Sequence, residues 1–213
     1  MTDTYTFTIE VYTEALLITG SYDLPLYRRV SDAINSRLHR FVTLRDASIA
    51  PLWKPQQSQR VPQLLVNWSD ALLVATLAEP EPPPGFQAPT PPRDTQSMMF
   101  FTPAFALRAN FYMRTDMELV SMLSEMTDDF LALSNVTVYP LHGGSSFGRE
   151  FVCLNRLRIQ ALYAVGAQIA HAPLPAANLE APPIPTPAPP PPPEVPPPPV
   201  PVPEETGDEE PAA

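Results

Sequence analysis

The residues of this chain that could do chemistry are few and stand far apart. No two of the three histidines, His39, His142 and His171, have a spacing typical of metal ligands or of one helix face. His142 opens the glycine-rich stretch 142–148, HGGSSFG, where Ser145 or Ser146 would be the nucleophile of a hydrolase and His142 its base. A catalytic imidazole also needs a fixed third group to orient it, and a loop of this kind does not supply one. We therefore expect no catalytic residue and no metal or cofactor, with hydrolysis as the remotest alternative.

The same glycine-rich stretch is the only candidate for a small-molecule loop. It lacks the Lys-Ser/Thr ending of a phosphate-binding loop, and it precedes a predicted strand instead of a helix. The corresponding loop at 53–60, WKPQQSQR, contains no glycine. The pattern is typical of a variable hairpin connection, so no small-molecule ligand is evident.

Prolines divide the chain into two folded parts and two extended ones. Of 31 prolines, 18 lie from Pro173 onward and 7 lie between Pro80 and Pro92. Proline fixes φ and removes a backbone donor, so both stretches are typical of extended segments. We predict a first β-rich repeat at 5–78, a Pro-rich linker at 79–97, a second β-rich repeat at 98–171 and a disordered, acidic, Pro-rich tail at 172–213.

Charge and hydropathy limit the partners. The formal net charge is −10, but seven acidic groups and no basic ones follow residue 172, so the rest of the chain is close to neutral. A near-neutral body gives no basic field for nucleic acid or an anionic membrane. The beginning, MTDTYTFTIE, has neither the basic nor the apolar part of a secretory leader, and no apolar run is long enough to span a membrane. We expect a cytoplasmic protein without membrane contact, and the single Cys153 as a buried, inert thiol.

One sequence pattern occurs twice in the chain, 89 positions apart. FVTLRDASIAPL at 41–52 matches FLALSNVTVYPL at 130–141. Apolar residues alternate with other residues over 16–24 and again over 105–113, which predicts a half-buried strand in each copy. A shorter alternation before each of these stretches predicts a preceding strand.

A change of period follows in both copies. Apolar residues recur at helical spacing from Val30 to Leu38 and from Leu119 to Met126, which predicts one short helix in each. The matched stretches 41–52 and 130–141 then change phase near Asp46 and Asn135, which indicates a bulge or tight bend. A final hairpin follows, with a turn at an asparagine.

The sequence thus predicts a mainly β (α+β) fold. We expect two tandem small, strongly bent sheets or barrels, each with one short helix between its second and third strands.

Two resemblances accompany this pattern. The stretch from Ala15 to Leu77, with RRVSDAIN at 28–35, resembles a small bacterial domain of unknown function that carries an R-x-S-D-x-x-N helix. It also resembles Sm-like barrels, which implies a five-stranded roll with a bent strand pair and a final hairpin. The RNA pocket of that family uses an Arg-Gly pair in the last hairpin, whereas this chain has NWSD at 67–70 and NRLR at 155–158. The resemblance therefore does not imply RNA binding by that route.

Opposite charges occupy matching places in the two copies and are our candidate interaction residues. Arg29 aligns with Glu118, and Arg40 aligns with Asp129. Such surfaces could dock within one chain, or head to tail between chains, where the contact could propagate. The full candidate set is Arg28, Arg29, Arg37, Arg40, Glu118, Asp128 and Asp129.

We therefore expect a non-catalytic interaction or assembly module whose partner is another protein or a second copy. The alternative is a nucleic-acid-binding module in which the arginines of the first repeat contact phosphates while Trp53 or Trp68 stacks on bases. The tail would be a spacer or a ligand for an aromatic groove of a partner.

Overall fold

The computed structural model describes residues 4–36, 40–87, 94–113 and 117–166. The predictions for Arg37, His39, His171 and the tail from 172 onward lie outside these residues. All the described residues belong to one compact unit.

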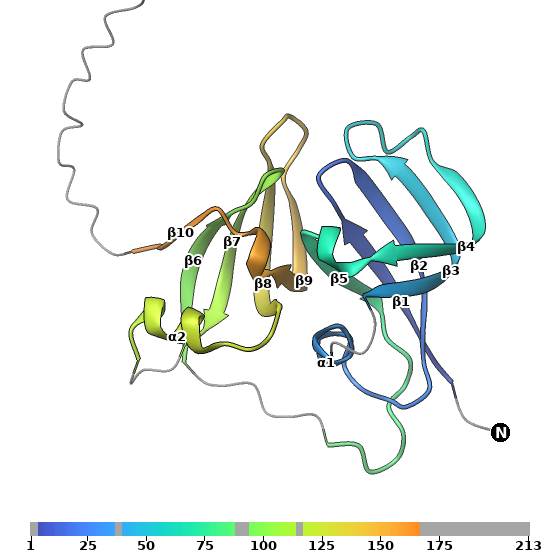
Figure 1. Cartoon of the computed structure of the whole chain (residues 1–213), viewed down its shortest axis with the longest axis horizontal. Coiled ribbons are helices and arrows are strands. Elements are labelled where there is room, and N and C mark those ends of the chain that lie inside the picture. Colours follow the sequence, from blue (N-terminus) through green and yellow to red (C-terminus); the bar gives the residue numbers. More distant parts are fainter. Residues whose placement is uncertain (1–3, 37–39, 88–93, 114–116, 167–213) are drawn as a thin grey trace, which may run out of the picture. The chain divides into compact units, whose positions relative to one another are not determined.

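The described residues contain ten β-strands, two short α-helices and two 3-10 turns (Figure 1). In chain order they are β1 (Tyr5–Tyr12), β2 (Leu16–Leu24), α1 (Val30–Asn35), β3 (Phe41–Pro51), β4 (Gln59–Asn67), η1 (Trp68–Asp70), β5 (Leu73–Ala78), β6 (Thr95–Phe101), β7 (Phe105–Tyr112), α2 (Leu119–Glu125), β8 (Phe130–Pro140), β9 (Phe147–Asn155), η2 (Arg156–Arg158) and β10 (Ala161–Ala164). We call 5–78 the first half and 95–166 the second half.

All the described strands belong to a single antiparallel sheet with the order β10-β6-β7-β8-β9-β5-β1-β2-β3-β4. The fold is mainly β, but the prediction of two separate bent sheets or barrels is wrong, because β5 pairs with β9 and joins the halves. The sheet does not close: among the described residues, β4 and β10 each have a neighbour on one side only. Periodicity shows which face a strand buries, but it does not show which strand lies beside it.

The alternating stretches are strands, as predicted. β2 buries every second side chain from Ile18 to Leu24, and β7 ends in a similar alternation through Ala109 and Phe111. The helices are shorter than their apolar stripes: α1 ends at Asn35, and α2 ends at Glu125.

The predicted bend in the third strand of each half is also confirmed. Asp46 and Asn135 have φ angles of 48° and 50°, in the left-handed region that favours Gly, Asn and Asp. At each of these residues the pairing with the preceding strand shifts register, so one extra residue bulges out. The two halves therefore carry the same irregularity 89 positions apart.

The pairing registers of the two halves match throughout. Phe41 lies opposite Asn67 in the first half, and Phe130 lies opposite Asn155 in the second. Each asparagine ends a strand and caps the 3-10 turn after it with its side-chain oxygen. Equivalent positions are thus 89 apart up to β3 and β8, and 88 apart from β4 and β9 onward.

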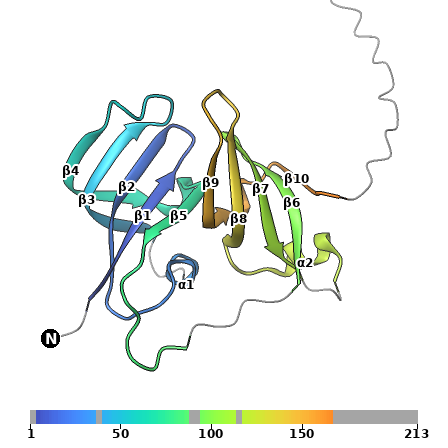
Figure 2. The same ribbon diagram turned by 180° about the vertical axis from the view of Figure 1, so that it is seen from behind.

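Each half has its own core, but each core borrows side chains from the other half. The core of the first half includes Phe130 and Cys153, and that of the second half includes Tyr12, Leu72 and Leu73. Viewed from the front and from behind, α1 lies beneath the place where the halves meet (Figures 1 and 2). The two halves are therefore parts of one folded unit.

Candidate functional site

The place where the halves meet, which we call the junction, is built on backbone pairing between β5 and β9. Leu73, Val74 and Ala75 lie opposite Leu154, Cys153 and Val152, and all six are buried. The Asn155 backbone N–H donates to the Leu72 carbonyl oxygen at 2.9 Å. Edge-to-edge strand pairing of this kind satisfies donors and acceptors that would otherwise face water.

Two asparagine side chains fasten the junction on either side of the paired strands. The Asn155 amide donates to the Ala71 carbonyl oxygen at 2.8 Å, while its side-chain oxygen accepts from the Leu157 N–H at 3.0 Å. Asn35, at the end of α1, accepts from the Phe130 N–H at 2.9 Å and donates to the Phe130 carbonyl at 3.0 Å. Each amide thus satisfies two backbone groups.

A polar cluster of Glu10, Tyr12 and Arg149 also joins the two halves. Arg149 donates to the Glu10 carboxylate at 2.6 Å and to the Tyr12 hydroxyl oxygen at 3.0 Å, and the Tyr12 hydroxyl donates to Glu10 at 2.6 Å. Burial, followed by the bond to Glu10, raises the pKa of Tyr12. Burial acts to lower the pKa of Arg149, but the bonds to Glu10 and Tyr12 raise it overall. Both side chains therefore keep their protons at neutral pH.

The outer strands of the sheet present large apolar side chains to solvent. Phe41 and Leu65 are exposed on β3 and β4, and Tyr163 is exposed on β10. Leu157, on η2, is also exposed. These side chains lie beside the two strands that have one neighbour among the described residues, which we call the β4 edge and the β10 edge.

Of the predicted basic residues, the structure describes Arg28, Arg29 and Arg40, which line three different hollows. Arg28 lines a groove beside Tyr22, whereas Arg29 stands immediately before α1 and lines a different hollow with Tyr27 and Phe86. Arg40 is exposed just before β3.

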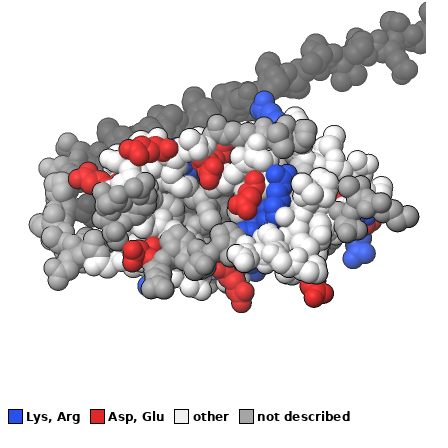
Figure 3. All heavy atoms as spheres, turned by 90° about the horizontal axis from the view of Figure 1, so that it is seen from below, with Lys and Arg blue, Asp and Glu red and all other residues white. Residues whose placement is uncertain are grey.

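The predicted acidic residues flank α2 and β8. Glu118 precedes α2 and is exposed, and Asp128 is exposed between α2 and β8. Asp129 lines the same hollow at the junction as Arg40. The structure therefore brings one aligned pair of opposite charges, Arg40 and Asp129, to the same hollow within a single chain. Figure 3 shows acidic and basic groups interspersed on the face seen from below, without a field of one sign.

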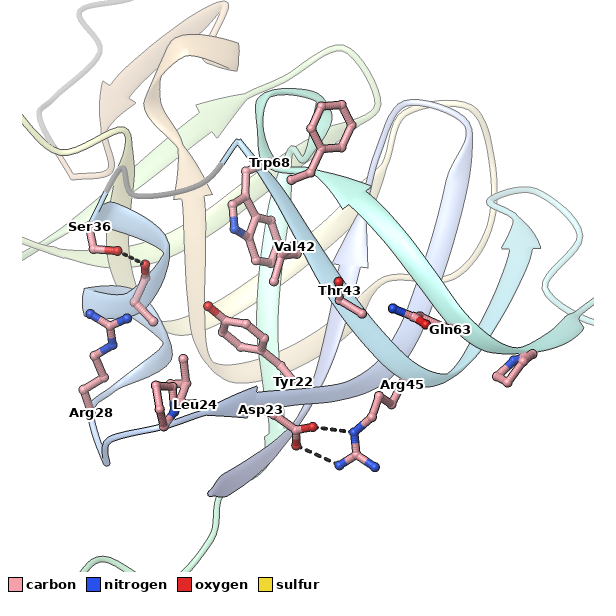
Figure 4. Close-up of a pocket in the computed structure, with 14 residues that line it drawn as sticks. Tyr22, Asp23, Leu24, Arg28, Ser36, Val42, Thr43, Arg45, Gln63 and Trp68 are labelled. Atoms are coloured by element: carbon pink, nitrogen blue, oxygen red, sulfur yellow. Dashed lines mark hydrogen bonds and ion pairs between the residues drawn. The ribbon is translucent and has the colours of Figure 1, made fainter. Parts of the chain in front are cut away.

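A groove of about 760 Å³ lies between α1 and strands β2 to β4 (Figure 4). Tyr22 and Trp68 form its floor, with their rings edge to face at 6.1 Å. Burial raises the pKa of Tyr22. Arg45 and Asp23 form an ion pair at its rim, with Arg45 donating to the second Asp23 oxygen at 2.8 Å.

The Asp23–Arg45 ion pair should make the stability of the protein depend on pH. The hydrogen bonds from Arg45 lower the pKa of Asp23, so the pair contributes stability above the unfolded-state pKa of about 3.9 and loses it as pH falls through the folded-state value. Asp23→Asn should lower the melting temperature by a few degrees at most at pH 7, because exposed pairs are screened. Melting curves from pH 7 to pH 2 should converge for the two proteins at the acid end. A gap that persists at pH 2 would contradict this assignment.

The histidine and serine singled out in the sequence line one hollow, and no hydrogen bond joins them among the described residues. His142 packs edge to face on Trp53 with ring centroids 5.1 Å apart, and its Nε2 lies 3.3 Å from the Pro103 carbonyl oxygen. Ser145 lines the same hollow, of about 600 Å³. The two rings hold together the β3–β4 and β8–β9 loops, which is a packing role.

The structure also bears on the cysteine, on metal ligands and on membrane-spanning helices. Cys153 is buried in the first core, and burial raises the pKa of its thiol, so the group stays protonated. In the part of the chain that the structure describes, no three His, Cys, Asp or Glu residues gather as metal ligands. The described helices are also all too short or too polar to cross a membrane.

We found no family model, curated protein or solved structure that matches this chain. The resemblances to a small bacterial domain and to Sm-like barrels stay predictions.

The residues that fasten the junction were missed at the sequence level. Glu10 and Arg149 lie 139 positions apart, so no spacing rule connects them. A signal was present for the strands: consecutive apolar residues at 72–75 and 151–154 are typical of strands flanked and covered on both sides.

Proposed function

We propose that this protein is a non-catalytic interaction or assembly module, built from two diverged copies of one small β domain. The observation that carries the proposal is the pair of outer strand edges flanked by exposed Phe41, Leu65 and Tyr163. An extended edge with apolar neighbours is a template for pairing with another protein. The tail from 172 onward would act as a spacer or a partner ligand, and the location would be the cytoplasm.

The position of the tryptophans disfavours the nucleic-acid alternative. Trp68 is 7% exposed and packs edge to face on Tyr22 and Phe130, so little of its ring is open to a base. Trp53 is exposed, but its ring packs on His142, and it is not among the residues that line the groove of Arg28. A basic groove with stacking rings is the usual arrangement for single-stranded nucleic acid.

Site-specific photo-crosslinking in cells tests the proposal. A photoreactive amino acid placed at Leu65 or at Tyr163 of the full chain should capture a protein, which mass spectrometry then identifies. The same amino acid at Glu150, which is exposed on the inner strand β9, is the matched control and should capture much less.

Two results would overturn the proposal. The first is capture at neither edge position. The second is a labelled oligonucleotide that the chain retards in a gel and that Arg28→Ala with Arg29→Ala releases, since this would indicate nucleic-acid binding.

A further inference from the structure

The two outer edges of the sheet are equivalent to the two strands that already pair at the junction. β10 occupies in the second half the place of β5, because Ala161 lies opposite Phe101 as Leu73 lies opposite Tyr12. β4 occupies in the first half the place of β9. In one molecule, β5 and β9 therefore pair with each other, while their equivalents β10 and β4 stand at the two outer edges of the sheet.

The backbone at both edges is directed outward at the positions needed for pairing. Asn155 donates its N–H to the Leu72 carbonyl oxygen, directly before β5. Backbone groups alternate sides along a strand, so the N–H and carbonyl of Cys153, two residues earlier, also face β5. The residue equivalent to Cys153 is Leu65, whose N–H and carbonyl then face away from β3. Directly after β10, Val165 donates its N–H to the Ser97 carbonyl oxygen of β6. Leu162 is an odd number of residues away, so its N–H and carbonyl face outward.

A proline in β4 does not obstruct this edge. Pro62 is three residues from Leu65, so its backbone points to the opposite side of β4, toward β3. The N–H that proline lacks would therefore have faced β3 and not the outer edge. There it falls in the gap of the register between Arg45 and Ala47, at the bulge. The β4 edge therefore keeps its donors at the positions that would pair.

The exposed apolar side chains of β3 and β4 match residues that are buried at the junction. Phe41 is 55% exposed, whereas its equivalent Phe130 is 4% exposed; Leu65 is 64% exposed, whereas its equivalent Cys153 is 1% exposed. Burial of Phe130 and Cys153 depends on the other half, since both belong to the core of the first half. Phe41 and Leu65 occupy the equivalent positions, but no other half of the molecule covers them.

We propose that the β10 edge of one copy pairs with the β4 edge of a second copy, in the register of the junction. Leu162 then lies opposite Leu65, with Ala161 opposite Val66 and Tyr163 opposite Leu64. The inference rests on the proposed function and names the partner as this chain itself. Each added copy brings a new edge of each kind, so the contact is head to tail and forms closed rings or open chains.

The contact between copies differs from the junction in its polar parts. Val61, Met99 and Phe101 stand at the places of Arg149, Glu10 and Tyr12, so the polar cluster is replaced by apolar side chains. Ser124 stands at the place of Asn35, so the two amide bonds to Phe130 have no counterpart. The contact is therefore weaker than the junction, dependent on concentration and insensitive to salt.

Complementary edge variants of the full chain test the proposal. Wild-type protein should gain mass in light scattering beyond two chains as its concentration rises, at low and at high salt. Leu65→Pro removes an outward N–H from β4, and Leu162→Pro does the same on β10, so each variant alone should stay monomeric. A mixture of the two should give a one-to-one complex that grows no further, because only one competent edge of each kind remains. Gln59→Pro, at the exposed start of β4, is the matched control and should assemble like the wild type.

A second measurement covers the case in which Leu162→Pro fails to fold, because Leu162 packs on the second core. Leu65→Cys and Leu162→Cys chains, mixed and oxidised, should form a disulfide-linked dimer, and the double variant should form a ladder of larger products. The pair Gln59→Cys and Leu162→Cys is the control.

Three results would overturn the inference. They are wild-type monomers at every concentration, assembly that survives Leu65→Pro, and cross-linking no greater than in the Gln59→Cys control. Capture of a different protein at Leu65 in cells, together with monomers in light scattering, would sink self-pairing while keeping the proposed function.

Discussion

Replacing Asn155 by alanine should lower the free energy of unfolding by about 3 kcal/mol, because it leaves a buried backbone carbonyl and a partly buried N–H without their partners. The side chain is 2% exposed, and it bonds to the Ala71 carbonyl and to the Leu157 N–H. Each unsatisfied buried group costs about 1–3 kcal/mol. Urea denaturation followed by circular dichroism measures the loss.

Asn67 provides the control, since it has the same place and the same capping role in the first half. Its side chain accepts from the Ser69 N–H at 3.1 Å, but its amide group donates to the exposed carboxylate of Asp70. Asn67→Ala should therefore cost about 1 kcal/mol or less, as for an exposed cap. Equal losses for the two variants would show that the junction adds nothing to the role of Asn155.

Arg149→Ala should destabilise the protein by about 3 kcal/mol, because it leaves the Glu10 carboxylate largely buried without its cation. The Glu10 side chain is 13% exposed and that of Arg149 is 27% exposed, and the two belong to opposite halves. Loss of Arg149 also removes a cation stacked 4.9 Å from the centre of the Phe147 ring. Thermal and urea unfolding at pH 7 give the size of the effect.

The matched control is Arg158→Ala, which removes another ion pair between the halves. Arg158 pairs with Glu14, whose side chain is half exposed, so water can solvate the carboxylate that remains. The expected loss is well below that of Arg149→Ala. Combining Arg149→Ala with Glu10→Gln should recover part of the stability, and no recovery would mean that the buried charge is not the cause of the loss.

The local structure of this chain could be predicted because it depends on neighbours in sequence. Alternation at 16–24 predicts β2 because one face of that strand is buried, and the change of phase at Asp46 predicts the bulge that its positive φ confirms. The helix lengths were overestimated because apolar residues beyond Asn35 and Glu125 continue the helical spacing past the end of the hydrogen-bonded turns.

The joining of the halves could not be predicted, because it depends on residues far apart in sequence. Val74 and Cys153 lie opposite each other, yet nothing in either stretch specifies the other as its neighbour. The aligned charges were a partial guide, since Arg40 and Asp129 do reach one hollow at the junction. The groups that fasten the junction most directly, Asn35, Asn155 and Arg149, are ordinary polar residues whose roles only the folded chain reveals.

The β5–β9 pairing also has a consequence for the order of events during synthesis. The first half leaves the ribosome before the second, and domains generally fold as they emerge. Its core nevertheless includes Phe130 and Cys153, and one edge of its strand β5, the edge opposite β1, stays unpaired until β9 has been made. A nascent chain therefore carries an open apolar strand edge while residues 79–155 are being synthesised, and neighbouring ribosomes on one message hold such strands close together. Chains made side by side can then exchange β9 before each has closed on its own.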